Sequence, residues 1–99
     1  MTYTYPALFT PAEEGGYLVR FPDIEGCYTD GDTFTEAREN GEDVLALMMC
    51  TWEEMGKSIP VPSSPGEIPV PEGGRITMIT ADTEAYRKAG HFQPASSHL

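Results

Sequence analysis

Basic residues are scarce in this chain. Only six of its 99 residues are Lys or Arg, against sixteen Asp or Glu, which gives a formal net charge of −10. A body this acidic repels the phosphate backbone, so direct nucleic-acid binding by this chain is not expected. The same charge favours a basic protein partner, although a role in solubility alone explains it equally well.

Long apolar runs and a secretory leader are also lacking. No apolar run approaches the roughly 18 residues that a membrane span needs, and the N-terminus MTYTYPALF lacks the basic start of a signal peptide. We therefore expect a cytoplasmic protein. The two cysteines, Cys27 and Cys50, have no CxxC or Cys/His pattern around them, so we predict buried thiols and no zinc site.

Signatures of catalysis are missing as well. Both histidines, His91 and His98, lie near the C-terminus without a base or nucleophile beside them, and no phosphate-loop pattern is present. Four acids follow predicted strands or turns and could hold Mg²⁺ in a metal-dependent nuclease: Asp23, Glu25, Asp30 and Asp32. Because Asp is common in turns anyway, the nuclease stays an alternative. We predict no enzyme activity, no catalytic residue, no metal site and no cofactor.

The N-terminal third contains the patterns of short strands. Aromatic residues alternate along Tyr3–Thr10, and a turn with two glycines leads to a second alternating stretch, Tyr17–Phe21. These two strands are expected to form an antiparallel hairpin. A short third strand is predicted over Cys27–Thr29, followed by a tight turn at Asp30–Asp32.

A long helix follows these strands. Thr33 and Glu36 have the spacing of a capping box, and apolar residues then recur every three or four positions until Gly56 ends the helix. Leu47 and Cys50 fall near its acidic side, either as isolated exposed residues or as part of a partner surface. The predicted core-facing residues are Phe34, Ala37, Gly41, Val44, Leu45, Met48, Trp52 and Met55.

The rest of the chain completes an α+β prediction. Five of the nine prolines lie in Ser58–Gly74, which predicts an extended connector crossing the domain. A fourth strand is predicted over Arg75–Ala81, parallel to one of the first three because a helix separates it from them. A short helix over Thr83–Ala89 and a disordered tail, residues 91–99, follow. The predicted order is therefore β-β-β-α-β: a three-stranded antiparallel meander, one long helix, a fourth strand and a short C-terminal helix.

A series of short motifs allows a family comparison. EGG stands at residues 14–16, FPDIEGC at 21–27, GDT at 31–33, EAREN at 36–40, IPVPS at 59–63 and ADTEAYRK at 81–88. In this order and spacing they strongly resemble the N-terminal body of the HicB family of antitoxins, over roughly residues 3–90. Each motif alone is weak, but several in the right order are specific.

The resemblance implies both a fold and a partner. It implies a partial RNase-H-like body, residues 1–90, that forms a homo-oligomer, a dimer or tetramer. It also implies binding to a small, basic, RNA-cleaving toxin, HicA, whose active site the body covers. The family's usual DNA-binding segment is not apparent in this chain, so promoter binding is not expected of it. An orphan regulatory or scaffold oligomer without a toxin is the alternative.

The expected toxin contacts come from charge and clustering, not from the resemblance. An acidic surface suits a basic, RNA-binding partner. We therefore predict a contact set of six acids: Asp23, Glu25, Asp30, Asp32, Glu36 and Glu39.

Overall fold

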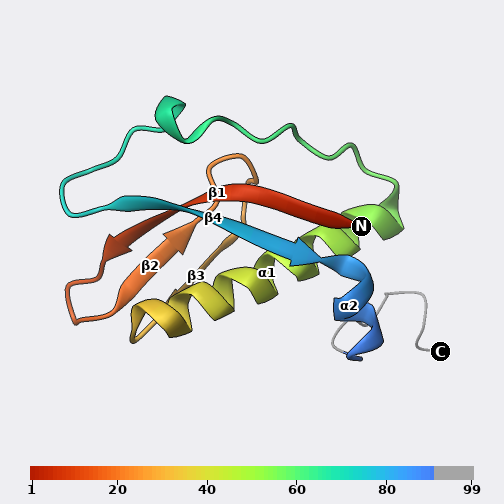
Figure 1. Ribbon diagram of the computed structural model, residues 1–99, viewed down its shortest axis with the longest axis horizontal. Coiled ribbons are helices and arrows are strands. Elements are labelled where there is room, and N and C mark those ends of the chain that lie inside the picture. The colour runs from red at the N-terminus through yellow and green to blue at the C-terminus, as the bar shows by residue number, and fades with distance from the viewer. Residues whose placement is uncertain (91–99) are drawn as a thin grey trace.

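The computed structural model describes residues 1–90 (Figure 1). Its elements are, in chain order, β1 (Thr2–Pro11), β2 (Tyr17–Arg20), β3 (Tyr28–Gly31), α1 (Phe34–Met55), a 3-10 turn η1 (Pro65–Glu67), β4 (Arg75–Asp82) and α2 (Thr83–Lys88). The predicted α+β class, its element order and the short C-terminal helix are thus confirmed. The predicted tail, residues 91–99, lies outside the described residues. Within residues 1–90, no helix has the length and apolar character to cross a membrane.

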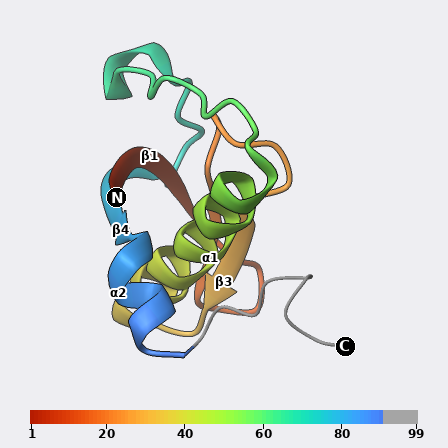
Figure 2. The same ribbon diagram turned by 90° about the vertical axis from the view of Figure 1, so that its right-hand side faces the viewer.

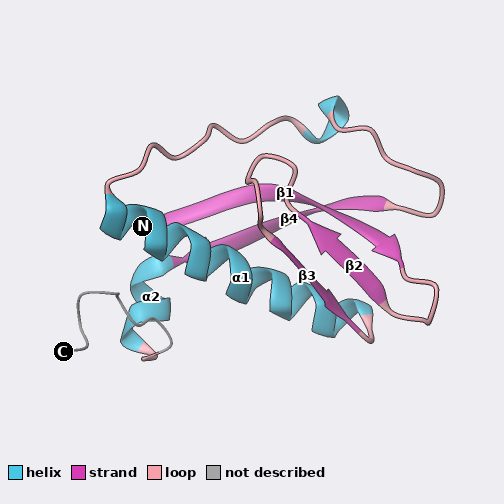
Figure 3. Ribbon diagram, turned by 180° about the vertical axis from the view of Figure 1, so that it is seen from behind, coloured by secondary structure: helices cyan, strands magenta, loops and turns pink. Residues whose placement is uncertain are grey.

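The four strands form one antiparallel sheet in the order β3-β2-β1-β4. The predicted hairpin and three-stranded meander are present, and α1 crosses the sheet along its length (Figures 2 and 3). β3 is longer than predicted, because Asp30 and Gly31 pair with Leu18 and Tyr17 of β2. Cross-strand pairing therefore overrides the turn preference of the Asp-Gly pair, and the chain bends at residues 32–33 instead.

The predicted parallel neighbour for β4 is wrong. β4 pairs antiparallel with β1, in a register that places Tyr5 opposite Ile79. The reason is the proline-rich connector, which runs back along the whole sheet after α1 has already crossed it (Figure 1, green to teal). A helix joined directly to the next strand gives a parallel crossover. Here the connector runs the length of the sheet once more, so β4 starts at the opposite end and runs in the opposite direction. The RNase-H-like likeness is not tested by this topology and stays a prediction.

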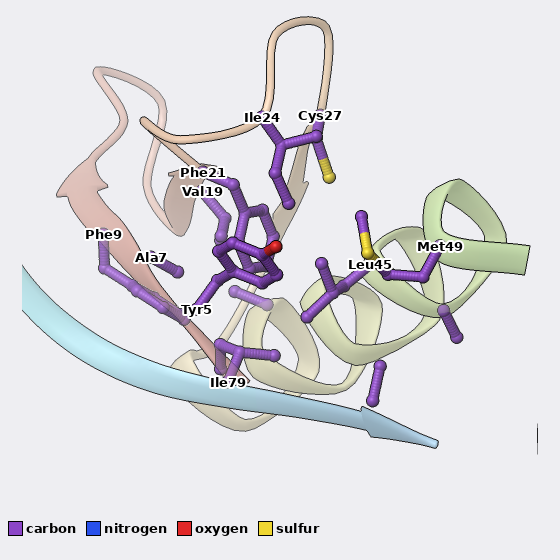
Figure 4. Packing of buried hydrophobic residues seen from close by; sticks show 13 residues of the cluster. Tyr5, Ala7, Phe9, Val19, Phe21, Ile24, Cys27, Leu45, Met49 and Ile79 are labelled. Carbon is purple, nitrogen blue, oxygen red and sulfur yellow. The ribbon is translucent and has the colours of Figure 1, made fainter. Parts of the chain in front are cut away.

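The core lies between α1 and one face of the sheet (Figure 4). Residues spaced four apart along α1, Ala37, Gly41, Leu45 and Met49, are buried along its inner face. They meet large side chains from the strands and the β2–β3 loop, among them Tyr5, Phe9, Val19, Phe21, Ile24 and Ile79. Apolar burial of this kind is the main favourable term in folding.

Four apolar residues of α1 differ from their predicted positions. Ala46 and Met49 were not predicted to face the core but are buried in it. Cys50, placed near the acidic side by the helical pattern, is fully buried, because α2 packs against that side of α1. Met55, predicted in the core, is 69% exposed. Trp52 packs against the core as predicted but is only partly buried, with the Lys57 ammonium 4.4 Å from its ring centre. Leu47 is exposed, as its place on the helix predicts.

A polar network joins α1 to β1 and α2 at one end of the sheet. The Glu53 carboxylate accepts hydrogen bonds from Tyr3 Oη at 2.7 Å, Thr83 Oγ1 at 3.0 Å and Arg87 Nη1 at 2.6 Å. Arg87 also donates to the Cys50 carbonyl. The network therefore links β1, α1 and α2 at one point.

This network shifts the acidity of two of its members. Burial raises the pKa of the Glu53 carboxyl, but hydrogen bonds from Tyr3, Arg87 and Thr83 outweigh it, so the pKa lies below its ordinary value. Burial and the bond to Glu53 raise the pKa of Tyr3 to about 12. Glu53 is thus charged and Tyr3 neutral at neutral pH.

Two leucines of α1 test which face of the helix packs against the sheet. Leu45→Ala leaves a cavity in the core and should lower the free energy of unfolding by about 2–5 kcal/mol. Leu47→Ala makes the same chemical change at a 44% exposed position and should change it by at most about 0.5 kcal/mol. Urea unfolding followed by circular dichroism measures both. Equal losses would show that this face of α1 is assigned wrongly.

The Glu53 network predicts a pH-dependent contribution to stability. The folded pKa lies below the unfolded value of 4.5, so the stabilisation is complete above that pH and is lost as the pH falls through the folded pKa. Glu53→Gln should therefore lower the free energy of unfolding by about 1–3 kcal/mol at neutral pH, and by less in acid.

Glu54→Gln is the matched control, because Glu54 is the adjacent acid, is 45% exposed and meets Arg87 only at 3.5 Å. Chemical unfolding of both variants at about pH 7 and about pH 3 makes the comparison. If Glu53→Gln lowers the free energy of unfolding by the same amount at both pH values, the stabilising role of the charged Glu53 carboxylate is contradicted.

Candidate functional site

An acidic cleft lies where the β1–β2 turn meets the end of β3 and the start of α1. Its volume is about 620 Å³. Five carboxylates line it: Glu13, Glu14, Asp30, Asp32 and Glu36. All five side chains belong to exposed residues, so they face solvent and are open to a partner.

Two glycines bring the three segments together. Gly16 has a φ of +77°, and a Cβ there would lie 2.4 Å from the Gly31 carbonyl oxygen. A Cβ on Gly31 would in turn lie 2.3 Å from the Ala37 nitrogen. The turn therefore packs on the end of β3, and β3 packs on the first turn of α1, backbone against backbone. The cleft acids are neighbours because of this close approach.

The helix cap fixes one rim of the cleft. Thr33 Oγ1 accepts a hydrogen bond from the Glu36 amide at 3.1 Å, which confirms the predicted N-cap. The Glu36 carboxylate accepts from the Asp32 amide at 3.3 Å, one residue before the cap itself. The positive end of the helix dipole lies beside these two acids and offsets part of their repulsion.

The six predicted contact acids do not form one group. Asp30, Asp32 and Glu36 share the cleft. Asp23 and Glu25 lie in the β2–β3 loop, where they border a different hollow beside Lys57. The sixth acid is exposed on α1 and does not line the cleft: Glu39.

Asp23 has a structural duty that sequence reasoning missed. Its carboxylate accepts from the Ser63 amide at 2.9 Å and from Ser63 Oγ at 2.5 Å. Close by, Tyr5 Oη donates to the Pro60 carbonyl. These bonds hold the proline-rich connector against the domain, so Asp23 is an anchor for the connector and is only partly exposed.

Glu13 and Glu14 belong to the cleft and were not predicted. Their position follows from register, because β2 pairs with β3 so that Tyr17 lies opposite Gly31. This pairing carries the turn before β2 to the end of β3. A longer predicted third strand would have revealed their position. If that strand is extended to Gly31, its pairing with β2 places the two turn acids beside Asp30.

The chemistry of the cleft suits cationic side chains. Among residues 1–90, no group of three or more His, Cys, Asp or Glu has an arrangement that could hold a metal ion. Exposed carboxylates at a cleft pair well with Arg and Lys, above all when Arg binds in a bidentate manner. A partner with a basic surface is therefore the ligand class that this geometry favours.

The cysteines do not add a reactive group to the site. Both are free and buried, as predicted. Burial raises the pKa of the Cys27 thiol to about 11 and also raises that of Cys50, so both stay protonated at neutral pH. Protonated, buried thiols are poor nucleophiles.

Comparison with known proteins places this architecture in a family. Residues 5–89 match the family model described as the HicB_like antitoxin of bacterial toxin-antitoxin systems. Antitoxin HicB 1 of Photorhabdus laumondii is 37% identical over 81 residues, covering 78% of this chain and 52% of that protein. Antitoxin HicB of Escherichia coli K12 is 35% identical over 83 residues, covering 78% of this chain and 60% of that protein. The chain thus spans between half and three-fifths of the length of these relatives.

Solved structures share the fold. A toxin-antitoxin complex from Streptococcus pneumoniae aligns with a TM-score of 0.81 at 22% identity, covering all of this chain and 78% of that one. A chain of the HicA3 and HicB3 toxin-antitoxin complex aligns with a TM-score of 0.64 at 30% identity, covering 81% of this chain and 99% of that one. With the family model matched over most of its length, the chain belongs to the HicB-like antitoxins of bacterial toxin-antitoxin systems.

Proposed function

We propose that the chain is the antitoxin of a type II toxin-antitoxin system that binds and occludes a HicA-like, RNA-cleaving toxin in the cytoplasm. The observation that carries this proposal is the acidic cleft, with five carboxylates on a protein of net charge −10. A related chain in a complex with HicA3 supports the class of partner.

The charges of the two proteins make occlusion physically reasonable. A toxin that cleaves RNA needs basic side chains to hold the phosphate backbone. Carboxylates compete for the same side chains, and charge complementarity also speeds the encounter of the partners. An antitoxin that occupies the toxin's basic surface therefore excludes RNA without any catalytic group of its own.

Within the expected contact set, the cleft acids are the proposed centre of the interface. Asp30, Asp32 and Glu36 stand together there, and Glu13 and Glu14 join them. Glu25 and Glu39 extend the acidic surface as peripheral contacts. Asp23 contributes by holding the connector through Ser63, so its replacement should act on stability as well as on binding.

The double variant Glu14→Lys/Asp30→Lys tests this contact set. Neither side chain has a hydrogen bond that the fold needs, so folding should be retained, while two attractive charges become repulsive. Affinity for the co-expressed toxin should fall by about tenfold or more at low salt, with a smaller loss at high salt. Isothermal titration calorimetry at two salt concentrations measures the effect, and rescue of growth from the toxin gives a second readout.

The variant Asp43→Lys/Glu72→Lys makes the same change in net charge at exposed positions outside the cleft and is the matched control. Equal affinities for the two double variants would remove the cleft from the interface. If the wild-type chain neither binds nor neutralises a basic toxin encoded beside it, the antitoxin proposal fails and the orphan oligomer takes its place.

A further inference from the structure

An apolar hollow lies on the outer face of the sheet, the face turned away from α1. Its volume is about 350 Å³, and residues of β1, β2 and β3 line it. Leu8 is only 7% exposed, whereas Leu18 and Tyr28 are 50% and 69% exposed. The hollow therefore has a covered apolar base and two large apolar side chains that are open to solvent.

The register of the strands explains why these side chains share one face. Val19 is buried in the core, so its neighbours in β2, Leu18 and Arg20, point to the outer face. Arg20 lies opposite Leu8 in the β1–β2 pair and opposite Tyr28 in the β2–β3 pair. Leu18 is a diagonal neighbour of both, within reach of long side chains. The hollow is thus built by the pairing of three strands.

The hollow continues the acidic cleft. Leu18 lines both of them, and it lies opposite Asp30, one of the five cleft acids. Facing residues of neighbouring strands have their Cβ atoms about 5 Å apart. A partner that covers the cleft acids therefore also reaches the hollow, with no gap between the two surfaces.

The charge of the cleft attracts basic proteins in general and does not distinguish among them. Exposed carboxylates act mainly on the rate of encounter, and salt weakens their effect. Protein interfaces draw most of their affinity from a few side chains, often aromatic, that lose their contact with water on binding. A binding protein of net charge −10 needs a contact of this second kind to discriminate between basic partners.

Arg20 adds a repulsive element to the hollow. Its side chain is exposed and lines the hollow, and it forms no ion pair within residues 1–90. The positive charge opposes a Lys or Arg at this point, whereas an uncharged apolar side chain can pack along the aliphatic stem of Arg20. The geometry thus favours an apolar side chain that stands beside a basic surface.

We propose that the hollow formed by Leu8, Leu18 and Tyr28 is the specificity contact of the antitoxin, and that it receives one exposed apolar or aromatic side chain of the toxin. That side chain stands next to the basic residues that pair with the cleft acids. This inference rests on the proposed function and deepens it: the cleft attracts the partner, and the hollow selects it.

Two variants that keep the net charge test the hollow. Leu18→Thr and Tyr28→Thr remove apolar surface and keep a residue that favours strands. Each should raise the Kd for the co-expressed toxin by about tenfold or more. The factor should be the same at low and at high salt, because no charge changes. Isothermal titration calorimetry measures the Kd, and circular dichroism checks that each variant is folded.

Met78→Thr is the matched control. Met78 is 43% exposed on the same outer face, but it belongs to β4 and does not line the hollow. The change in side chain is of the same kind, so a general loss of apolar surface would act equally at both places. The Kd for the toxin should stay at the wild-type value in this variant.

A non-cognate basic protein tests the role of Arg20. Arg20→Gln removes the repulsion, so the Kd for cytochrome c should fall by about threefold or more at low salt. Arg38→Gln makes the same change in net charge on the exposed surface of α1, outside both the cleft and the hollow, and should lower that Kd less. Equal effects of the two variants would show that Arg20 acts only through net charge.

The outcomes separate this inference from the proposed function. If the wild-type chain does not bind the toxin, both fail. If it binds, and Leu18→Thr and Tyr28→Thr bind equally well or lose affinity only at low salt, the hollow is not a contact and only this inference fails. Sedimentation velocity without toxin tests the other occupant: a lower mass for Leu18→Thr than for the wild type would assign the hollow to a second copy and overturn the proposal.

Discussion

The fold depends on how closely α1 can approach the sheet. One 22-residue helix, α1, lies across the inner face of the sheet, and contacts at three places fix its position. At its start, Gly31 lets the backbone of β3 touch the backbone of Ala37. In the middle, Leu45 is buried between α1 and the sheet, and near the end of the helix Glu53 hydrogen-bonds to β1 and α2. A side chain at residue 31 would lift the helix start and separate the acids that now share a cleft.

Local patterns were enough to predict the elements but not their partners. Alternation along β1 and β2, the Thr33 cap and the Gly56 end each depend on neighbours in sequence, and each was predicted correctly. The direction of β4 depends on a connector whose path no local pattern encodes. Cys50 is buried by α2, and Glu13 and Glu14 reach the cleft through the β2–β3 register. These positions depend on contacts between residues far apart in the sequence, which the periodicity of a single element does not encode.

The acidic cleft and the β4 edge occupy different parts of the molecule and differ in their chemistry. The cleft gathers charge at the turn end of the meander, where exposed carboxylates attract a basic partner. The β4 edge is uncharged over its centre and offers backbone groups and apolar side chains. The two surfaces involve different elements, so a substitution at one leaves the side chains of the other unchanged.

The place of β1 between β2 and β4 has a consequence for synthesis of the chain. β1 is made well before β4, yet along one side its backbone groups find their partners only in β4, where Tyr5 lies opposite Ile79. Contacts so distant in sequence are slow to form because a long loop must close first. Until β4 has left the ribosome, the nascent meander and helix leave one side of β1 unpaired, in what becomes the middle of the sheet. Such an unfinished edge is prone to misassociation, and it gives chaperones and proteases their opportunity to act.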